Sequence, residues 1–149
     1  MKKLWLVAIV AAGLLLVLPA TAQTDNLAIA VAEYDKVIAR ASGAGWFFIA
    51  PAAAKAQIDA IKPFILDVRR ADEFAAERIA GAVNIPITEL AKRLGELPAN
   101  KAAPMIVYCK AGIRGSFGMS LVQLADYTNA RNVTGGIDAW KAAGLPVVK

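Results

Sequence analysis

Apolar positions recur along the chain with two different periods, and their alternation predicts a mixed α/β protein. Three- and four-residue steps, as in Leu27, Val31 and Tyr34, predict amphipathic helices. Short runs of β-branched and aromatic residues, such as 64–68 and 105–108, predict buried strands. We expect strands over 46–49, 64–68, 82–85, 105–108 and 132–133, and helices over 25–41, 51–61, 72–80, 88–97, 116–126 and 137–143.

Capping residues and glycines delimit these elements. Residues typical of helix N-caps are Asp25 or Asn26, Asp72, Thr88 and Ser116. Gly81 and Gly144 stand where helices are expected to end. Because strands alternate with helices along the chain, we expect one parallel sheet with helices on both faces.

The first 22 of the 149 residues have the pattern of a secretory signal peptide. Lys2 and Lys3 precede a 15-residue apolar run, and Ala20-Thr21-Ala22 fits a cleavage site before Gln23. An uncleaved anchor is the alternative, but the run is short of the ~20 residues that span a bilayer. We expect an exported protein, periplasmic if from a Gram-negative bacterium, with no stable membrane insertion after cleavage. A helical extension (23–45) and one domain (46–149) follow.

Net charge gives no support for nucleic-acid binding. The chain carries +5, of which Lys2 and Lys3 supply two charges, so the mature chain would carry +3. The largest basic cluster is the pair Arg69 and Arg70, which a solvated face explains. We therefore expect no nucleic-acid partner.

The counts of cysteine and histidine restrict the possible chemistry further. The single cysteine, Cys109, excludes an internal disulfide and a CxxC redox pair. The absence of histidine excludes Cys–His catalysis and histidine-based zinc or copper sites. We expect neither a metal nor a cofactor.

Cys109 lies between a predicted strand and a predicted helix, the usual place for ligands in an open α/β sheet. Glycines in such a loop let backbone N–H groups turn inward, and N–H groups at a helix N-terminus attract anions. These dipoles, with nearby cations, favour thiolate over thiol. A buried structural cysteine is the alternative, but the setting favours a reactive one. The predicted site comprises Cys109 as nucleophile and the loop residues Lys110, Ala111, Gly112, Ile113, Arg114 and Gly115.

Asp67 ends the strand over 64–68 and needs a partner there, because a buried carboxylate is rarely left unpaired. Arg114 could contact substrate, or it could pair with Asp67 and fix the loop on the neighbouring strand. We favour the pairing, since buried charges are usually compensated. Arg69 is interpreted as a salt-bridge or rim residue.

From Trp46 to Lys149, about 104 of the 149 residues, the chain resembles a single rhodanese domain. Four motifs carry the resemblance: 65–69 with Glu73 and Phe74; 79–86; 108–116, with the spacing Cys-x-x-Gly-x-Arg; and 135–140 with 143–147. One departure is Glu77-Arg78-Ile79, where the family usually has Gly-His-Ile.

This resemblance implies a small five-stranded parallel sheet and sulfurtransferase activity. Cys109 would take sulfane sulfur from a small anionic donor such as thiosulfate, hold it as a persulfide and pass it to cyanide or a thiol. Backbone N–H groups of residues 110–115 would hold the terminal sulfur, and Lys110 would attract the donor.

Two other functions share features with this one. Phosphatases of related architecture place one more residue between cysteine and arginine, whereas Arg114 is five positions after Cys109. The smaller ring of amides suits a sulfur atom better than a tetrahedral oxyanion. A non-turnover persulfide carrier, or a protein-binding module with a protein sulfur acceptor, remains the alternative.

Overall fold

Five parallel strands form the central sheet of the computed structural model, which describes residues 20–41 and 47–149. In spatial order they are β1 (Phe48–Ile49), β5 (Ala130–Val133), β4 (Met105–Tyr108), β2 (Phe64–Asp67) and β3 (Val83–Asn84). The central strand, β4, pairs with β2 and β5. Because all pairs are parallel, the segments that follow β2, β4 and β5 meet at one edge of the sheet.

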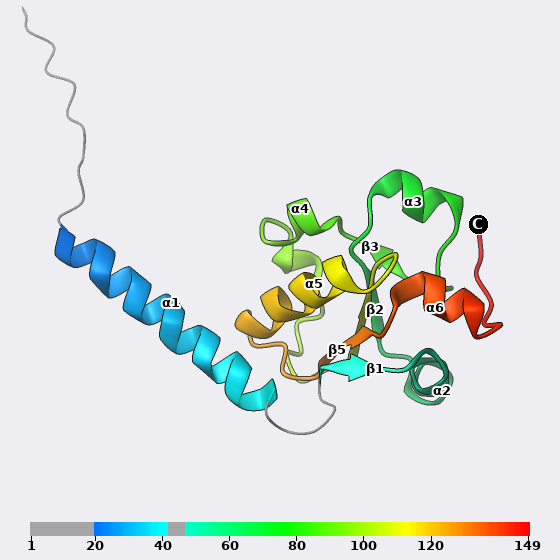
Figure 1. Ribbon diagram of the computed structural model, residues 1–149, viewed down its shortest axis with the longest axis horizontal. Helices are drawn as coiled ribbons and strands as arrows, with labels where there is room; N and C mark the ends of the chain where they lie inside the picture. The colour runs from blue at the N-terminus through cyan, green and yellow to red at the C-terminus, as the bar shows by residue number, and fades with distance from the viewer. Residues whose placement is uncertain (1–19, 42–46) are drawn as a thin grey trace, which may run out of the picture.

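Helices cover both faces of this sheet (Figure 1). They are α1 (Ala20–Ala41), α2 (Pro51–Ile61), α3 (Ala71–Ala76), α4 (Ile87–Leu90), α5 (Ile113–Leu124) and α6 (Gly136–Ala142), with a 3-10 turn, η1, over Leu94–Glu96. The core on one face includes Leu90 of α4 and Met119 of α5. The other core includes Ala54 of α2 and Trp140 of α6. The predicted α/β fold with a five-stranded parallel sheet and two helical layers is confirmed.

The side chains of β4 alternate between the two cores, and this alternation places Cys109. Met105 and Val107 lie in the core beneath α5, whereas Ile106 and Tyr108 lie in the core beneath α2 and α6. Cys109, one residue beyond the strand, lies in the core beneath α5 and is 1% exposed. The thiol is therefore on the side of the sheet that α5 covers.

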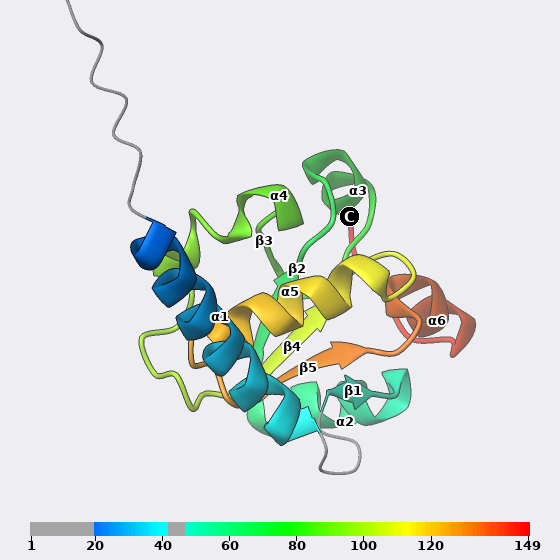
Figure 2. The same cartoon turned by 60° about the vertical axis from the view of Figure 1, so that its left-hand side comes forward.

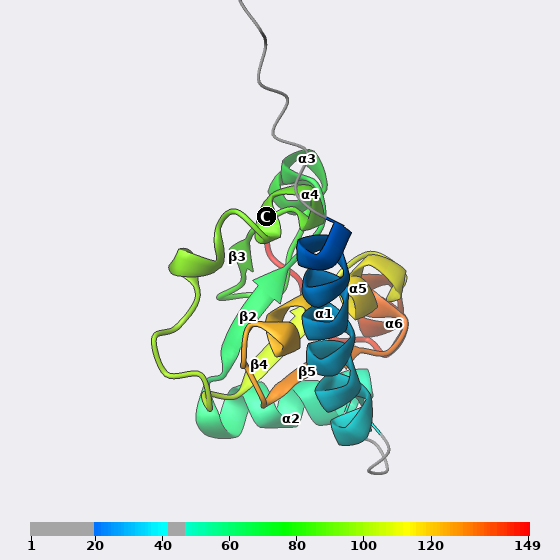
Figure 3. The same ribbon diagram turned by 90° about the vertical axis from the view of Figure 1, so that its left-hand side faces the viewer.

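Helix α1 lies outside these layers and crosses over α5 (Figures 2 and 3), and its N-terminal half projects away from the domain (Figure 1). Val37 is buried, and the guanidinium of Arg40 donates to the backbone oxygen of Gln123 at 3.4 Å. In contrast, Leu27 is 65% exposed and Tyr34 is 49% exposed. The domain is therefore contacted by the face that carries Val37 and Arg40, and not by the predicted apolar face, whose side chains Leu27, Val31 and Tyr34 are exposed.

Several predictions about the N-terminal region remain untested. The signal peptide lies outside the described residues except for 20–22, which form the start of α1. Trp46, where the first strand was expected to begin, also lies outside them. None of the helices within 20–41 and 47–149 is long and apolar enough to cross a membrane.

Helix α5 begins earlier than predicted, because its N-cap is Gly112 and not Ser116. Gly112 adopts the left-handed conformation (φ 98°), which turns the chain from the loop into the helix. The N–H and the hydroxyl of Ser116 both donate to Gly112 O, at 2.9 and 3.1 Å, so Ser116 lies within the first turn. Glycine has no side chain that identifies it as an N-cap in the sequence. The hydroxyl of Ser116 was therefore the stronger capping signal.

Helix α3 differs from prediction at both ends, since its N-cap is Arg70 rather than Asp72 and it ends at Ala76 rather than Ala80. After Ala76 the backbone becomes extended, and Arg78 pairs with Val148 through two 2.8 Å hydrogen bonds. These backbone hydrogen bonds to the C-terminal segment replace the ones that a longer α3 would form.

The helix expected over 88–97 is divided into α4 and η1. Its N-cap is Pro86 and not Thr88. The predicted apolar positions are nevertheless correct, because Leu90 is buried and Leu94 packs against the same core.

Candidate active site

Cys109 directly follows β4 at the edge of the sheet where the segments after β2, β4 and β5 converge. The N–H of Gly112 donates to its Sγ at 3.1 Å. Helix α5 begins at the next residue, Ile113, so the positive end of its dipole adjoins the sulfur. A hydrogen bond from the backbone together with a helix N-terminus stabilises a thiolate.

The predicted loop residues divide into an exposed and a buried set. Lys110, Ala111 and Ile113 are exposed, and Arg114 is half-buried. Gly112 and Gly115 are buried. The two glycines therefore lie on the buried side of the loop, and the longer side chains lie on its exposed side.

Backbone contacts with α6 hold the start of the loop. The N–H of Ile137 donates to Cys109 O at 2.8 Å, and the N–H of Asp138 donates to Lys110 O at 3.0 Å. Gly136 makes this approach possible, because a Cβ there would lie 2.4 Å from Cys109 O. The N-terminus of α6 thus binds two loop carbonyls, and it fixes the peptide next to the thiol.

Arg114 pairs with Glu73 of α3 and not with Asp67, which corrects the pairing favoured from the sequence. Its Nη1 and Nη2 donate to the two carboxylate oxygens of Glu73, at 2.7 and 2.9 Å. The hydrogen bonds from Arg114 lower the pKa of Glu73 from 4.5 to about 2. This bidentate pair joins α3 to the first turn of α5 across 41 residues of sequence.

Asp67 pairs instead with Arg69, two residues further along, and both side chains are almost completely buried. Arg69 donates through its backbone N–H (2.9 Å), Nε (2.9 Å) and Nη2 (2.6 Å). Burial lowers the pKa of Arg69, but the hydrogen bond and charge of Asp67 outweigh it and the pKa is raised. Interpreting Arg69 as a salt-bridge residue is therefore correct.

Tyr108 extends this buried cluster from the end of β4. Burial, followed by the negative charge of Asp67, raises the pKa of its phenol above the ordinary value. Its hydroxyl accepts a hydrogen bond from the N–H of Ile79 at 3.2 Å. The strand that carries Cys109 is thus tied to the segment before β3.

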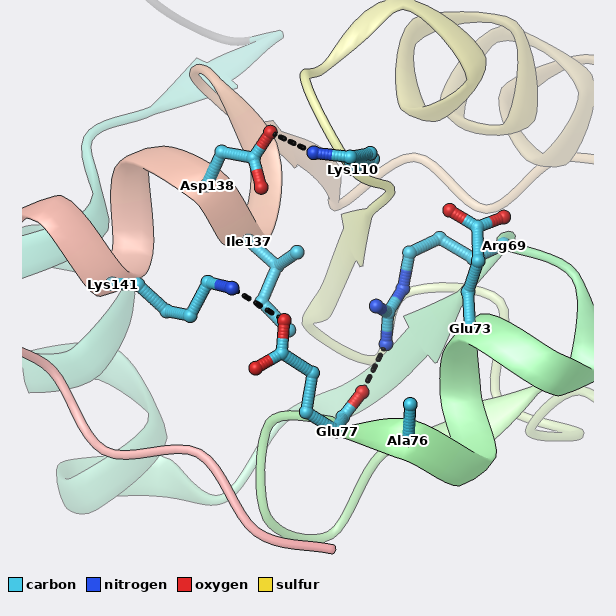
Figure 4. Close-up of a pocket in the computed structure, with 8 residues that line it drawn as sticks. All are labelled: Arg69, Glu73, Ala76, Glu77, Lys110, Ile137, Asp138 and Lys141. Carbon is cyan, nitrogen blue, oxygen red and sulfur yellow. Dashed lines mark hydrogen bonds and ion pairs between the residues drawn. The ribbon is translucent and has the colours of Figure 1, made fainter.

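A cavity of about 290 Å³ lies between α3 and α6, beside the loop (Figure 4). It is lined by Arg69, Glu73, Ala76, Glu77, Lys110, Ile137, Asp138 and Lys141. Lys110 pairs with Asp138 at 2.7 Å, and Lys141 pairs with Glu77 at 2.5 Å. Both pairs are partly exposed, so each contributes little to stability.

Lys110 is the predicted donor-attracting cation, and it stands at the rim of this cavity with 61% of its side chain exposed. Ion pairs this exposed are weak and are screened by salt. The position is compatible with the predicted role. Within 20–41 and 47–149, no cluster of three histidine, cysteine, aspartate or glutamate side chains could hold a metal ion.

Three residues that support the site were not assigned to it from the sequence: Glu73, Asn132 and Gly136. Glu73 and Gly136 belong to the motifs that carry the family resemblance, but neither was given a role at the thiol. Asn132 donates through Nδ2 to Gly112 O at 2.9 Å, and nothing in its sequence context indicates that contact. In each case the partner is distant in sequence, so periodicity and capping signals do not reveal it.

Comparison with known proteins agrees with this architecture. The family model described as "Rhodanese-like domain" matches residues 50–143. A sulfurtransferase of Allochromatium vinosum is 30% identical over 84 residues, covering 56% of this chain and 77% of that protein. Thiosulfate sulfurtransferase PspE of Escherichia coli is 31% identical with the same coverage. An uncharacterised protein of Synechocystis is 32% identical over 93 residues, and the match spans half of its length.

Solved structures give the same result. A rhodanese-related protein from Thermoplasma volcanium has a TM-score of 0.62 at 31% identity, covering 69% of this chain and 98% of that one. Thiosulfate sulfurtransferase of Pseudomonas aeruginosa also has a TM-score of 0.62, at 28% identity, covering 68% of this chain and 20% of that one. The family match includes Cys109, its loop and the residues that support it on both sides, and the chain belongs to the rhodanese-like domain family.

Proposed function

We propose that the protein transfers sulfane sulfur from a small anionic donor such as thiosulfate to a thiophilic acceptor through a persulfide on Cys109. Family membership and the sulfurtransferases among its relatives support sulfur transfer in general. The observation that carries the finer proposal is the hydrogen bond from Gly112 N–H to Cys109 Sγ at the N-terminus of α5.

The proposed reaction has two displacement steps. The Cys109 thiolate attacks the outer sulfur of thiosulfate, an S–S bond forms to Cys109, and the bond to the sulfonate sulfur breaks with release of sulfite. Cyanide or an acceptor thiolate then attacks the terminal sulfur and takes it, which returns the Cys109 thiolate. A pre-formed thiolate needs no general base, and this agrees with a chain that lacks histidine.

The surrounding residues have separate roles in this proposal. The N–H of Gly112 and the N-terminus of α5 stabilise the negative charge on the attacking sulfur, and later on the persulfide. Lys110 at the rim of the cavity attracts the anionic donor. Arg114 holds the loop against Glu73 and so maintains the positions of the amides.

Thiosulfate-to-cyanide transfer by the purified protein tests the proposal. Wild-type protein is expected to form thiocyanate, and Cys109→Ser is expected to form none, because a hydroxyl cannot carry the sulfane sulfur. Equal turnover in both would overturn the assignment of Cys109. Intact mass after incubation with thiosulfate gives a second readout, one added sulfur atom in the wild type and none in the variant.

A persulfide carrier that exchanges sulfur with another protein is the second candidate. Two apolar side chains in the first turns of α5, Ile113 and Phe117, are 71% and 67% exposed beside a thiol that is 1% exposed. Such a surface suits a protein that presents an acceptor thiol. Negligible turnover with cyanide by folded, reduced protein, together with a persulfide on Cys109, would favour the carrier.

Export is proposed on the N-terminal pattern alone. Expression of the full chain in a Gram-negative host, followed by intact mass of the periplasmic fraction, tests it. A chain that begins at Gln23 is expected. Full-length protein retained in the membrane fraction would contradict cleavage and favour an anchor.

A further inference from the structure

Asn132 is a buried polar residue of β5 that the reaction described above does not use. It stands in register with Val107 of β4, two residues before the nucleophile, and it is 1% exposed. Burying an amide is unfavourable unless it is hydrogen-bonded, so its contacts indicate what the side chain does.

The side-chain amide of Asn132 binds the turn that holds the thiol. Nδ2 donates to Gly112 O at 2.9 Å and to the hydroxyl of Ser116 at 3.0 Å. Gly112 O also accepts from the N–H and the hydroxyl of Ser116, at 2.9 and 3.1 Å. Gly112 is the residue whose N–H donates to Cys109 Sγ. A single residue therefore separates the Asn132 amide from the reactive sulfur.

Gly115 leaves the space that this side chain occupies. A Cβ at Gly115 would lie 2.2 Å from Asn132 Oδ1, and the three atoms nearest to that Cβ all belong to Asn132. Oδ1 itself is buried without a hydrogen-bond partner among the described residues. A buried acceptor that lacks a partner is unfavourable, so the contribution of this residue must come from the hydrogen bonds that its Nδ2 donates.

We propose that Asn132 is a positioning residue that holds Gly112 in its left-handed conformation and so directs the Gly112 N–H at Cys109 Sγ. The inference rests on the proposed role of Cys109 as the nucleophile. Asn132 acts through Gly112 on the sulfur, and Gly115 is a glycine because Asn132 occupies the space beside it.

Gln123 offers a matched control for this role. It is also a buried amide, 3% exposed, and its Oε1 likewise lacks a partner among the described residues. Its Nε2 donates to Ala130 O at 3.1 Å, at the opposite end of β5 from the loop. Replacing either amide by alanine removes a buried hydrogen-bonding group, but only one of the two groups reaches the thiol loop.

The experiment measures alkylation of Cys109 by iodoacetamide across pH in the full chain, for wild type, Asn132→Ala and Gln123→Ala. Asn132→Ala is expected to slow alkylation at neutral pH about tenfold and to move the midpoint of the pH profile upward, because a hydrogen bond to the charged sulfur is lost. Gln123→Ala is expected to lower the melting temperature and to keep the wild-type midpoint. The charged residues around the loop are unchanged in every variant: Asp67, Arg69, Glu73, Lys110, Arg114 and Asp138.

A second variant keeps the test decisive if Asn132→Ala folds poorly. Gly115→Ala displaces the Asn132 amide without altering it and is expected to move the midpoint in the same direction. In the Asn132→Ala background, Gly115→Ala should add no further shift, because the two substitutions break one contact. Additive shifts, or a wild-type midpoint in folded Asn132→Ala, would overturn the proposal. Alkylation requires no sulfur transfer. A protein that transfers no sulfur can therefore still show the expected alkylation profiles, so failure of the proposed function and failure of this inference are distinguishable.

Discussion

The Cys109 loop is held from two sides, and the two sides use different chemistry. On the side of β2, ion pairs support it: Asp67 with Arg69, and Glu73 with Arg114. On the side of β5, the buried contacts are uncharged: the amide of Asn132 and the N-terminal N–H groups of α6. The ion pair of Lys110 with Asp138 on this side is exposed. The Glu73–Arg114 pair and the uncharged contacts both act on residues 109–114.

This difference indicates where the positive potential at the sulfur originates. Each arginine near the loop is matched by a carboxylate, so the β2 side contributes little unbalanced charge. The uncharged side orients backbone dipoles. A fixed dipole interacts more strongly with a nearby charge where water is excluded than it does in water. We infer that the ion pairs fix the frame of the site, whereas the amides act on the thiol.

The largest expected effect comes from Asp67→Asn on the ionic side. The substitution leaves Arg69 buried with an uncompensated charge, and breaking such a pair costs about 3–5 kcal/mol. Chemical denaturation measures the loss. Asp72→Asn is the matched control, because Asp72 pairs with Arg70 where both side chains are largely exposed. Equal loss in the two variants would show that burial of the pair is unimportant.

Gly136→Ala should produce the next largest effect, on the uncharged side. The left-handed conformation costs about 1–2 kcal/mol for alanine, and the overlap with Cys109 O adds about 1–3 kcal/mol. Gly144→Ala has a similar φ of 72°, with no atom within 4 Å of the new Cβ, so it carries the conformational cost alone. Unfolding free energies and turnover should separate the variants, with a loss of turnover in Gly136→Ala. Matching values would contradict a tight contact with the loop.

Glu73→Gln should have a moderate effect that depends on pH. The pKa of Glu73 is lowered from 4.5 to about 2, so its pairing stabilises the fold above pH 4.5 and is lost as pH falls toward 2. At neutral pH the variant is expected to lose about 1–2 kcal/mol, a value reduced by partial exposure of the pair. The difference from wild type in thermal unfolding should vanish near pH 2. A constant difference across this range would exclude an ionic contribution.

The smallest structural effect is expected for Lys110→Glu, whose partner Asp138 is also exposed. Stability should change by less than about 1 kcal/mol. The KM for thiosulfate should rise several-fold at low salt and less at high salt, because attraction of an anion is screened. Persulfide formation from a neutral donor should change less. Lys92→Glu, an exposed site after α4, controls for net charge, and an equal rise in KM there would exclude local steering.

Some of this architecture follows from local sequence signals. Residues 105–108 form the predicted buried strand, and Cys109 directly follows it as expected. Helix α2 and the end of a helix just before Gly144, whose φ is positive, were also predicted correctly. Each rests on interactions within a few residues, namely burial on both faces of a strand, proline in a first helical turn, and a positive φ after a helix.

The partners of the charged and amide groups were decided by tertiary structure. From the sequence, Arg114 was expected either to contact substrate or to pair with Asp67, and the pairing was favoured because a buried carboxylate needs a compensating charge. The short side chain of Asp67 is instead occupied by Arg69, and α3 brings Glu73 to Arg114. Local pattern carries no information on which of two carboxylates a guanidinium will reach.

The sequence by itself therefore determined the fold class, the position of the single thiol at the edge of the sheet and the glycine-rich loop around it. These depend on the period of apolar residues and on backbone preferences, which act locally. Only the tertiary structure decided which groups hold the loop: Glu73, Asn132 and the N-terminus of α6. Those contacts join segments about 20 to 40 residues apart, and they exist because the parallel sheet brings the ends of its strands together.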